Sequence, residues 1–173
     1  PNDPDKFYTL LLQQAKALTE GETDDIAILS NLSALLGQGL AEINWVGFYR
    51  YMNGELLLGP FQGLPACVHI PIGKGVCGTA ARTLQTQRVE DVHLFPGHIA
   101  CDGASESEIV IPMVVNNELY GVLDIDAPVK NRFTETDRQY LERFVKDLCD
   151  YIEKKVKLFI NPTFFSFRIS VVN

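Results

Sequence analysis

Residues 107–127 read SEIVIPMVVNNELYGVLDIDA. Both halves of this stretch are rich in β-branched and other apolar residues, and Asn116-Asn117 stands between them. Asparagine accepts the left-handed backbone that a two-residue hairpin turn requires. The pattern therefore predicts two antiparallel strands that are joined at the two asparagines.

A second hairpin is predicted nearer the N-terminus. The runs INWVGFYRY (residues 43–51) and ELLLGPF (residues 55–61) are rich in aromatic and apolar residues, and Asn53-Gly54 between them is a strong turn signal. Shorter strands are predicted in CVHIPI (residues 67–72) and RVED (residues 88–91). The longer expected strands thus lie in antiparallel hairpins.

A helix is predicted before the first hairpin, over about residues 4–20. Asp3 is placed to cap its N-terminus, and Gly21 ends it. The expected inward face of this helix consists of Phe7, Leu10, Leu11 and Leu18.

Three more helices are predicted. One begins between Thr23 and Asp25 and ends at residues 37–39, and a short one is opened by the glycines of residues 72–84. The last runs over about residues 134–155, with acidic residues in its first turn. An antiparallel sheet with helices packed on it is an α+β fold.

Composition limits the class of protein. At 173 residues, with 46% hydrophobic and 21% charged residues, the chain fits one folded domain. Its net charge of −7 and dispersed basic residues argue against a nucleic-acid partner. No apolar run approaches the roughly 20 residues that cross a membrane, and residues 1–7 lack the features of a signal peptide. Four cysteines without a secretory signal indicate a reducing compartment, so a cytoplasmic location is expected.

The end of the chain differs from the rest. LFINPTFFSFRISVVN (residues 158–173) is aromatic, almost uncharged and interrupted by Pro162. We therefore expect one domain over residues 1–157, followed by an apolar tail. Three roles stay open for the tail: pairing with a sheet edge, covering a dimer interface, or being an addition foreign to the domain.

Three of the four cysteines stand where a structural cysteine is uncommon. Cys101 precedes a polar loop, and Cys67 is expected at the edge of a strand, so both suggest redox chemistry. Cys77 lies near the start of the short helix, where the helix dipole is expected to favour its thiolate. Cys149 borders the apolar face of the last helix and is interpreted as structural.

Zinc is the main alternative for such thiols. The chain contains no C-x-x-C motif, and its cysteines and histidines lack the usual paired-ligand spacings. No metal is therefore expected. The residues considered for such a site are Cys67, His69, Cys77, His93 and His98.

Two carboxylates alternate with apolar residues in the second strand of the 107–127 hairpin. Asp124 and Asp126 are two residues apart and therefore share one face of the strand, while Glu108 opens the adjacent strand. Two interpretations stay open. The acids belong either to a solvated sheet face, or to a pocket where they bind a cation and donate a proton, in which case crowding raises at least one pKa.

Four features together are specific. They are NWVGFY at residues 44–49, the three cysteines spaced ten and twenty-four residues apart, SEIVIP at residues 107–112 and GVLDID at residues 121–126. In these features the chain resembles the free methionine-(R)-sulfoxide reductases, single GAF domains that act on the free amino acid. The resemblance covers about residues 5–155. It implies a dimer with a six-stranded antiparallel sheet between helices.

The resemblance also implies roles for the thiols. Cys101 is the nucleophile, Cys67 forms a disulfide with it, and Cys77 corresponds to a cysteine associated with regeneration. The expected reaction is attack of the Cys101 thiolate on the sulfoxide sulfur, while an acid protonates the oxygen. The resulting sulfenic acid condenses with Cys67. Thioredoxin or a similar dithiol then reduces the disulfide, and no cofactor is needed.

The resemblance further implies a substrate pocket for free methionine-(R)-sulfoxide. Charge pairing of the substrate ammonium with the acids explains selectivity for the free amino acid. Backbone N–H groups within residues 73–78 are the candidates for binding its carboxylate. The acids implied in binding and catalysis are Glu108, Asp124 and Asp126, and the aromatic residues implied at the methyl group are Trp45 and Tyr49.

Two other functions remain possible from the sequence. One is a GAF module that binds a small ligand for sensing or regulation and performs no chemistry. The other is an interaction domain that uses the apolar tail to bind a protein. Tolerance of Cys101→Ser, or indifference to methionine sulfoxide, distinguishes these functions from the reductase.

Overall fold

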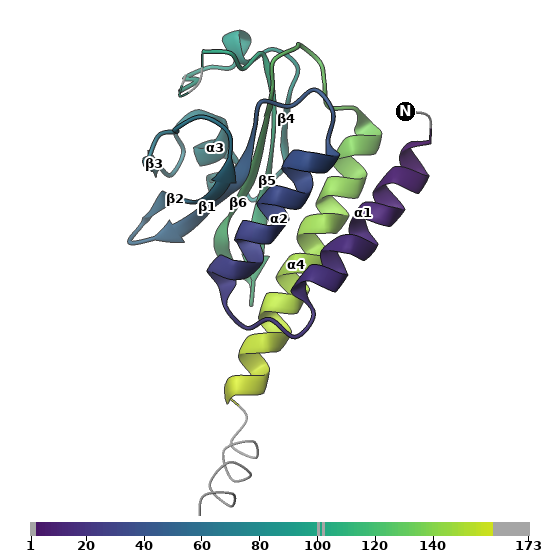
Figure 1. Ribbon diagram of the computed structural model, residues 1–173. Helices are drawn as coiled ribbons and strands as arrows, with labels where there is room; N and C mark the ends of the chain where they lie inside the picture. Colours follow the sequence, from purple (N-terminus) through teal and green to yellow (C-terminus); the bar gives the residue numbers. More distant parts are fainter. Residues whose placement is uncertain (1–2, 100, 102, 161–173) are drawn as a thin grey trace, which may run out of the picture.

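A six-stranded antiparallel sheet in the order β3-β2-β1-β6-β5-β4 forms the centre of the computed structural model, which describes residues 3–99, 101 and 103–160 (Figure 1). This arrangement confirms the expected α+β fold. The strands are β1 (Trp45–Met52), β2 (Glu55–Gln62), β3 (His69–Pro71), β4 (Gln87–Val89), β5 (Ser107–Val115) and β6 (Glu118–Ala127).

Helices cover both faces of the sheet (Figure 1). α2 (Asp25–Gly39) and α4 (Glu135–Ile160) lie on one face, with α1 (Pro4–Thr19) packed against them. The shorter α3 (Gly75–Thr83) lies on the other face, and a 3-10 turn, η1, spans Val92–Leu94. Among the described residues, no helix is both long and apolar enough to cross a membrane.

Both predicted hairpin turns are confirmed. Asn53 and Gly54 have φ angles of 53° and 82°, and Asn116 and Asn117 have φ angles of 52° and 62°. Positive φ at both central residues gives a tight turn whose twist matches that of the flanking strands. The two turns thereby align β1 with β2 and β5 with β6.

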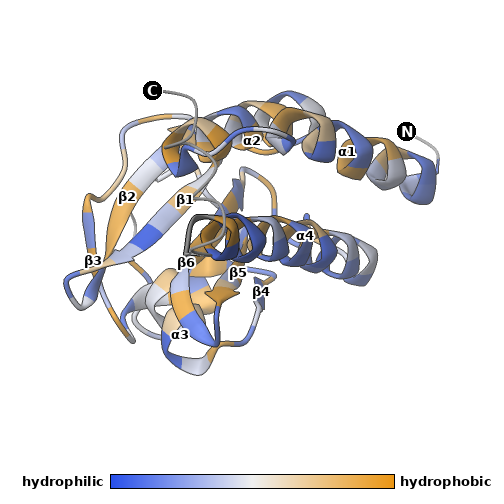
Figure 2. Cartoon of the chain, turned by 90° about the horizontal axis from the view of Figure 1, so that it is seen from below, coloured by the Kyte–Doolittle hydropathy of each residue, from blue (hydrophilic) through white to orange (hydrophobic). Residues whose placement is uncertain are grey.

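Alternation along the central strands separates two cores. The larger core lies between the sheet and α1, α2 and α4, and includes Phe48, Leu123 and Ile125 from the sheet. The smaller one lies under α3 and includes Tyr49 and Val122. α4 presents mainly hydrophilic residues at its surface (Figure 2). The side of α4 that faces the sheet is apolar, as expected from its sequence.

The first helix buries a different face from the expected one. Its buried side chains include Tyr8 and Leu11. Tyr8 is turned inward because its hydroxyl donates a 2.5 Å hydrogen bond to Asp137 and its ring stacks 4.8 Å from Tyr140. The expected face was wrong for three residues that are exposed, namely Phe7, Leu10 and Leu18.

Some element boundaries also differ from the expected ones. β3 begins at His69, so Cys67 precedes the strand; the β2–β3 ladder stops short of Pro60, which has no N–H to extend it. β4 starts and ends earlier than the predicted residues 88–91. α4 continues to Ile160, past the expected domain boundary at residue 157. Most of the predicted tail, residues 161–173, lies outside the described part of the chain.

Candidate active site

The register of the three central strands brings the predicted acids and aromatic residues together. Glu108 on β5 lies opposite Asp126 on β6, and Asp126 lies opposite Trp45 on β1. One step along, Asp124 is flanked by Val110 and Gly47. Since residues two apart share a face, the acids lie on the same side of the sheet as Trp45 and Tyr49, toward α3. Phe48 of β1 points to the other side, into the main core.

A cavity lies between this sheet face and α3. It measures about 40 Å³, which is room for roughly three water molecules. Seven of the eight site residues predicted from the sequence line it, namely Trp45, Tyr49, Cys77, Cys101, Glu108, Asp124 and Asp126.

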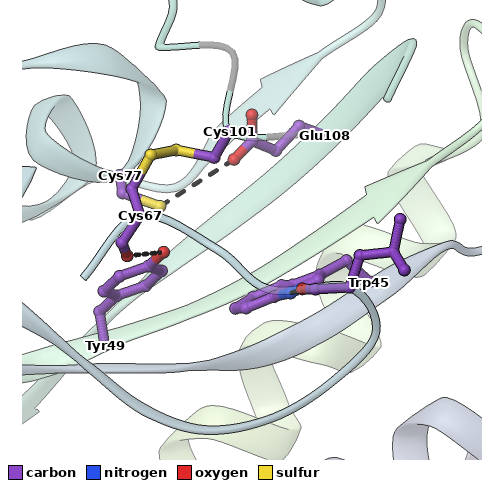
Figure 3. The surroundings of a disulfide bond; sticks show 7 residues. Trp45, Tyr49, Cys67, Cys77, Cys101 and Glu108 are labelled. Carbon is purple, nitrogen blue, oxygen red and sulfur yellow. Dashed lines mark hydrogen bonds between the residues drawn. A yellow bond between two sulfur atoms is a disulfide. The ribbon is translucent and has the colours of Figure 1, made fainter. Parts of the chain in front are cut away.

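The eighth predicted residue, Cys67, is joined to Cys101 by a disulfide, with the two Cα atoms 5.6 Å apart (Figure 3). The bond connects the segment before β3 with the segment before β5, across 34 residues. The Cys101 segment also packs on the start of α3: a Cβ atom added to Gly75 would lie 3.1 Å from Ile99. Both cysteine sulfurs are thereby held beside the acids.

Two aromatic residues of β1 form one wall of the cavity and hold the Cys67 segment (Figure 3). The Tyr49 hydroxyl donates a 2.9 Å hydrogen bond to the carbonyl oxygen of Cys67, and the Trp45 indole donates a 3.1 Å bond to the carbonyl oxygen of Leu64. The Trp45 ring stacks 5.3 Å from Phe61 and 6.0 Å from Tyr49. Burial and the neighbouring carboxylates raise the pKa of Tyr49, which keeps its hydroxyl protonated as a donor.

The third cysteine of the site, Cys77, is buried on α3, with its sulfur 4.0 Å from Oε1 of Glu108 (Figure 3). Burial, followed by the charges of Asp124 and Glu108, raises the pKa of this thiol well above its usual value. The expectation that the helix dipole favours a thiolate was therefore wrong, because desolvation and two nearby acids outweigh the dipole.

The acids form a crowded and largely buried group. Glu108 and Asp124 are each only 6% exposed, so the interpretation as a solvated sheet face was wrong. Burial raises the pKa of both side chains, and the charges of Asp124 and Asp126 raise that of Glu108 further. The expectation that crowding raises at least one pKa is confirmed. Burial and crowding therefore favour the protonated forms of these carboxyl groups more than solvent would.

Sequence reasoning missed other side chains of the cavity. Lys74 lies at the N-cap position of α3, and Ser105 accepts a 3.2 Å hydrogen bond from Asn44. His98 is part of the same loop as Cys101, and burial lowers its pKa. Lys74, Ser105 and His98 all line the cavity. Their proximity in sequence to Cys77 and Cys101 was the only available signal.

Hydrogen bonds and packing bear on two further expectations. Within the expected carboxylate-binding segment, the N–H groups of Gly73, Lys74 and Gly78 already bond to backbone carbonyl oxygens. The N–H groups of residues 75–77 are left as candidates. Cys149 is buried in the main core against the sheet, as a structural cysteine should be.

The comparisons with known proteins agree with this geometry. The family model for the GAF domain matches residues 25–153. The free methionine-R-sulfoxide reductase of Escherichia coli is 56% identical over 143 residues, which are 83% of this chain and 87% of that protein. The chain belongs to the GAF-domain family of free methionine-R-sulfoxide reductases.

Solved structures of this family are equally similar. The substrate complex of the Staphylococcus aureus enzyme is 58% identical, with a TM-score of 0.81, and the match covers 84% of this chain and 95% of that one. The Neisseria meningitidis reductase in complex with its substrate is 39% identical, with a TM-score of 0.86, and the match covers 91% and 95% of the two chains. The family resemblance that the sequence motifs indicated is confirmed.

The buried acids of this family member make its stability depend on pH. A carboxyl whose pKa is higher in the folded than in the unfolded chain stabilises the fold at low pH, and this contribution is lost as pH rises above about 4.3, the unfolded value for glutamate. Glu108→Gln removes one such group. We expect the variant to unfold with a free energy that exceeds that of the wild type by about 1 kcal/mol or more at pH 8, the cost typical of a buried polar group left without a partner, and by less at pH 5.

Urea-induced unfolding at the two pH values measures this difference. Glu118→Gln, at the exposed start of β6, is the matched control. An equal difference between Glu108→Gln and the wild type at both pH values would mean that the Glu108 carboxyl is as acidic in the folded as in the unfolded chain.

Proposed function

We propose that the chain reduces free methionine-(R)-sulfoxide to methionine with Cys101 as the nucleophile. The observation that supports this most directly is the Cys67–Cys101 disulfide, which lies beside buried carboxyl groups at a cavity. A sulfoxide reductase needs this combination, since it must attack sulfur, protonate oxygen and trap the oxidised cysteine. The substrate named for the relatives agrees with it.

The reaction then runs in two steps, reduction of the sulfoxide and formation of the disulfide. The Cys101 sulfur attacks the sulfoxide sulfur and takes up its oxygen, so that methionine leaves and Cys101 becomes a sulfenic acid. The Cys67 thiol attacks that sulfenic acid, the sulfur–sulfur bond forms, and the oxygen leaves as water. Reduction of the disulfide has to precede the next turnover, because the attack on the substrate requires the free Cys101 thiol.

Glu108 is the favoured proton donor in the first step. Its carboxyl is almost fully buried, and Asp124 and Asp126 keep it neutral by repelling a third negative charge. A neutral carboxylic acid at neutral pH can protonate the sulfoxide oxygen, which an ionised carboxylate cannot do. The remaining carboxylates are then available to attract the substrate ammonium.

The other end of the substrate meets different groups. Trp45 and Tyr49 offer an apolar wall for the methyl group. Lys74 lies on the opposite side of the cavity, at the start of α3, and brings a positive charge to a site that otherwise carries three acids. We assign Lys74, together with the backbone at the start of α3, to the α-carboxylate of the substrate.

Regeneration and assembly complete the proposal. Thioredoxin or a similar dithiol protein reduces the disulfide in a cytoplasmic environment, and Val68 and Ile99, 50% and 37% exposed, offer it apolar contacts next to the two cysteines. The chain forms a homodimer, for which exposed Phe7, Leu10 and Leu18 on α1 offer apolar surface. Sedimentation that detects only monomer at micromolar concentration would contradict the dimer.

The reductase activity is tested with racemic free methionine sulfoxide and dithiothreitol. We expect the R epimer alone to disappear with the wild type and with Cys149→Ser, and neither epimer to disappear with Cys101→Ser, because a hydroxyl is a much weaker nucleophile. Chiral chromatography follows both epimers. Near-normal turnover by Cys101→Ser would overturn the proposed nucleophile, and no turnover by the wild type would favour a ligand-sensing module.

The variant Cys67→Ser distinguishes the role of the nucleophile from that of the resolving thiol. This variant should release about one methionine per chain in a single round and then turn over slowly with thioredoxin, because the thiol that traps the sulfenic acid is missing. A burst measurement by rapid quench detects that round. Unchanged thioredoxin-supported turnover would assign the resolving role to Cys77.

Lys74→Met tests recognition of the carboxylate. Methionine keeps the apolar stem of the side chain and removes its charge, so KM for methionine sulfoxide should rise about tenfold, the size of one charged contact, while kcat changes less than about twofold. Lys146→Met is the control, since Lys146 pairs with Asp150 on the exposed side of α4. Equal KM values for the two variants would exclude Lys74 from substrate binding.

A further inference from the structure

Three potential metal ligands converge at the base of the cavity. Cys77 on α3, Glu108 on β5 and Asp124 on β6 each offer one donor atom, and these three atoms lie within 4.8 Å of one another. All three side chains are buried. The set was invisible in the sequence, because its members belong to three different elements and share no short spacing.

The spacing of the three donor atoms is compatible with a zinc site after small adjustments. Zinc binds sulfur at about 2.3 Å and carboxylate oxygen at about 2.0–2.2 Å, so neighbouring ligand atoms lie roughly 3.5 Å apart. The Cys77 sulfur and Oε1 of Glu108 are 4.0 Å apart. Small side-chain rotations therefore bring the three donors into coordination range, and the adjoining cavity leaves room for a water molecule as the fourth ligand.

One oxygen of the Asp124 carboxyl has no hydrogen-bond partner in the described part of the chain. Oδ1 of Asp124 is buried and accepts no hydrogen bond from the described residues. Buried polar atoms of this kind are uncommon and call for a water or an ion. Lys74 lines the cavity from the start of α3 and carries a positive charge, whereas burial lowers the pKa of His98 in the Cys101 loop and so disfavours its charged form. A divalent cation among the three donors would neutralise the crowded acids directly.

A second group of possible ligands serves as a contrast. Asp91, His93 and Glu106 also come together, but His93 is exposed and Lys130 already lies 3.0 Å from Asp91. A divalent cation would neutralise little additional charge at this exposed group. The Cys77 group differs because it is buried and contains a soft thiol ligand beside two carboxylates.

We propose that Cys77, Glu108 and Asp124 form a binding site for a thiophilic divalent cation such as Zn²⁺. On binding, the cation displaces the protons of the thiol and the carboxyl groups, which is why affinity increases with pH. The bound ion occupies Glu108 and Asp124, so it competes with methionine sulfoxide and slows the reductase. This last consequence rests on the proposed function, whereas the binding of the metal does not.

Cobalt(II) bound to the disulfide form tests the site without any measurement of activity. Of the four cysteines in the chain, Cys67 and Cys101 have no thiol in this form, so a thiolate ligand comes from Cys77 or Cys149. The protein is loaded with Co²⁺ and desalted, and its metal content and near-ultraviolet thiolate-to-cobalt absorption are measured. Zn²⁺ is then added to displace the cobalt.

We expect one retained Co²⁺ with the thiolate absorption in the wild type and in Cys149→Ser. The absorption should be lost in Cys77→Ser, and binding should weaken at least about tenfold in Asp124→Asn, which removes one charged ligand. If Cys77→Ser does not fold, as judged by a thermal melt, Asp124→Asn decides.

Three results would overturn the site: no retained metal in the wild type, the thiolate absorption persisting in folded Cys77→Ser, or unchanged affinity in Asp124→Asn. A protein that binds cobalt as expected but leaves methionine sulfoxide unchanged would refute the proposed function and leave the metal site intact.

Discussion

The alternation of side chains along β6 is the constraint on which the rest of the structure depends. Asp124 and Asp126 point to one face of the sheet, whereas Leu123 and Ile125 point into the main core on the other. A slip of one residue would bury two acids among α1, α2 and α4 and expose two large apolar side chains. The register is therefore strongly specified, and the asparagine turn before β6 and the pairing with β1 maintain it.

The unequal cores on the two faces of the sheet follow from this arrangement. The face with the acids cannot be covered by a large apolar layer, because buried carboxyl groups need polar or ionisable neighbours. It is covered instead by the short α3 and by the irregular segments that carry Cys67 and Cys101. These segments hold their positions through the disulfide and through hydrogen bonds from Tyr49 and Trp45. The face covered by α1, α2 and α4 carries the main core of the fold, and the face covered by α3 and the irregular segments holds the site.

The same crowding gives the site both of its proposed properties. Burial of Glu108 and the charges of the acids beside it raise its pKa, which favours the neutral acid that proton donation requires. The closeness that makes two adjacent charges unfavourable also places two oxygen donors and the Cys77 sulfur around one point. A proton and a divalent cation are alternative ways to neutralise such a group. Proton donation and metal binding are therefore expected to exclude each other.

The sequence by itself determined the elements that depend on near neighbours. The hairpin turns at Asn53-Gly54 and Asn116-Asn117, and the common face of Asp124 and Asp126, follow from local backbone preferences and from the two-residue repeat of a strand. The four features at residues 44–49, at the three cysteines, at residues 107–112 and at residues 121–126 together were sufficient to indicate the family. A turn or a repeat requires only a few adjacent residues, which is why these features were predictable.

Only the tertiary structure decided what depends on distant partners. Tyr8, and not the predicted Phe7, lies on the inner side of α1, because its hydroxyl donates a hydrogen bond to Asp137, far along the chain. Lys74 lines the cavity because α3 packs across the sheet. The thiol of Cys77 keeps its proton, against the preference of its helix position, because β5 and β6 place Glu108 and Asp124 beside it. Burial and charge interactions are sums over all surrounding elements, so no short stretch of sequence contains them.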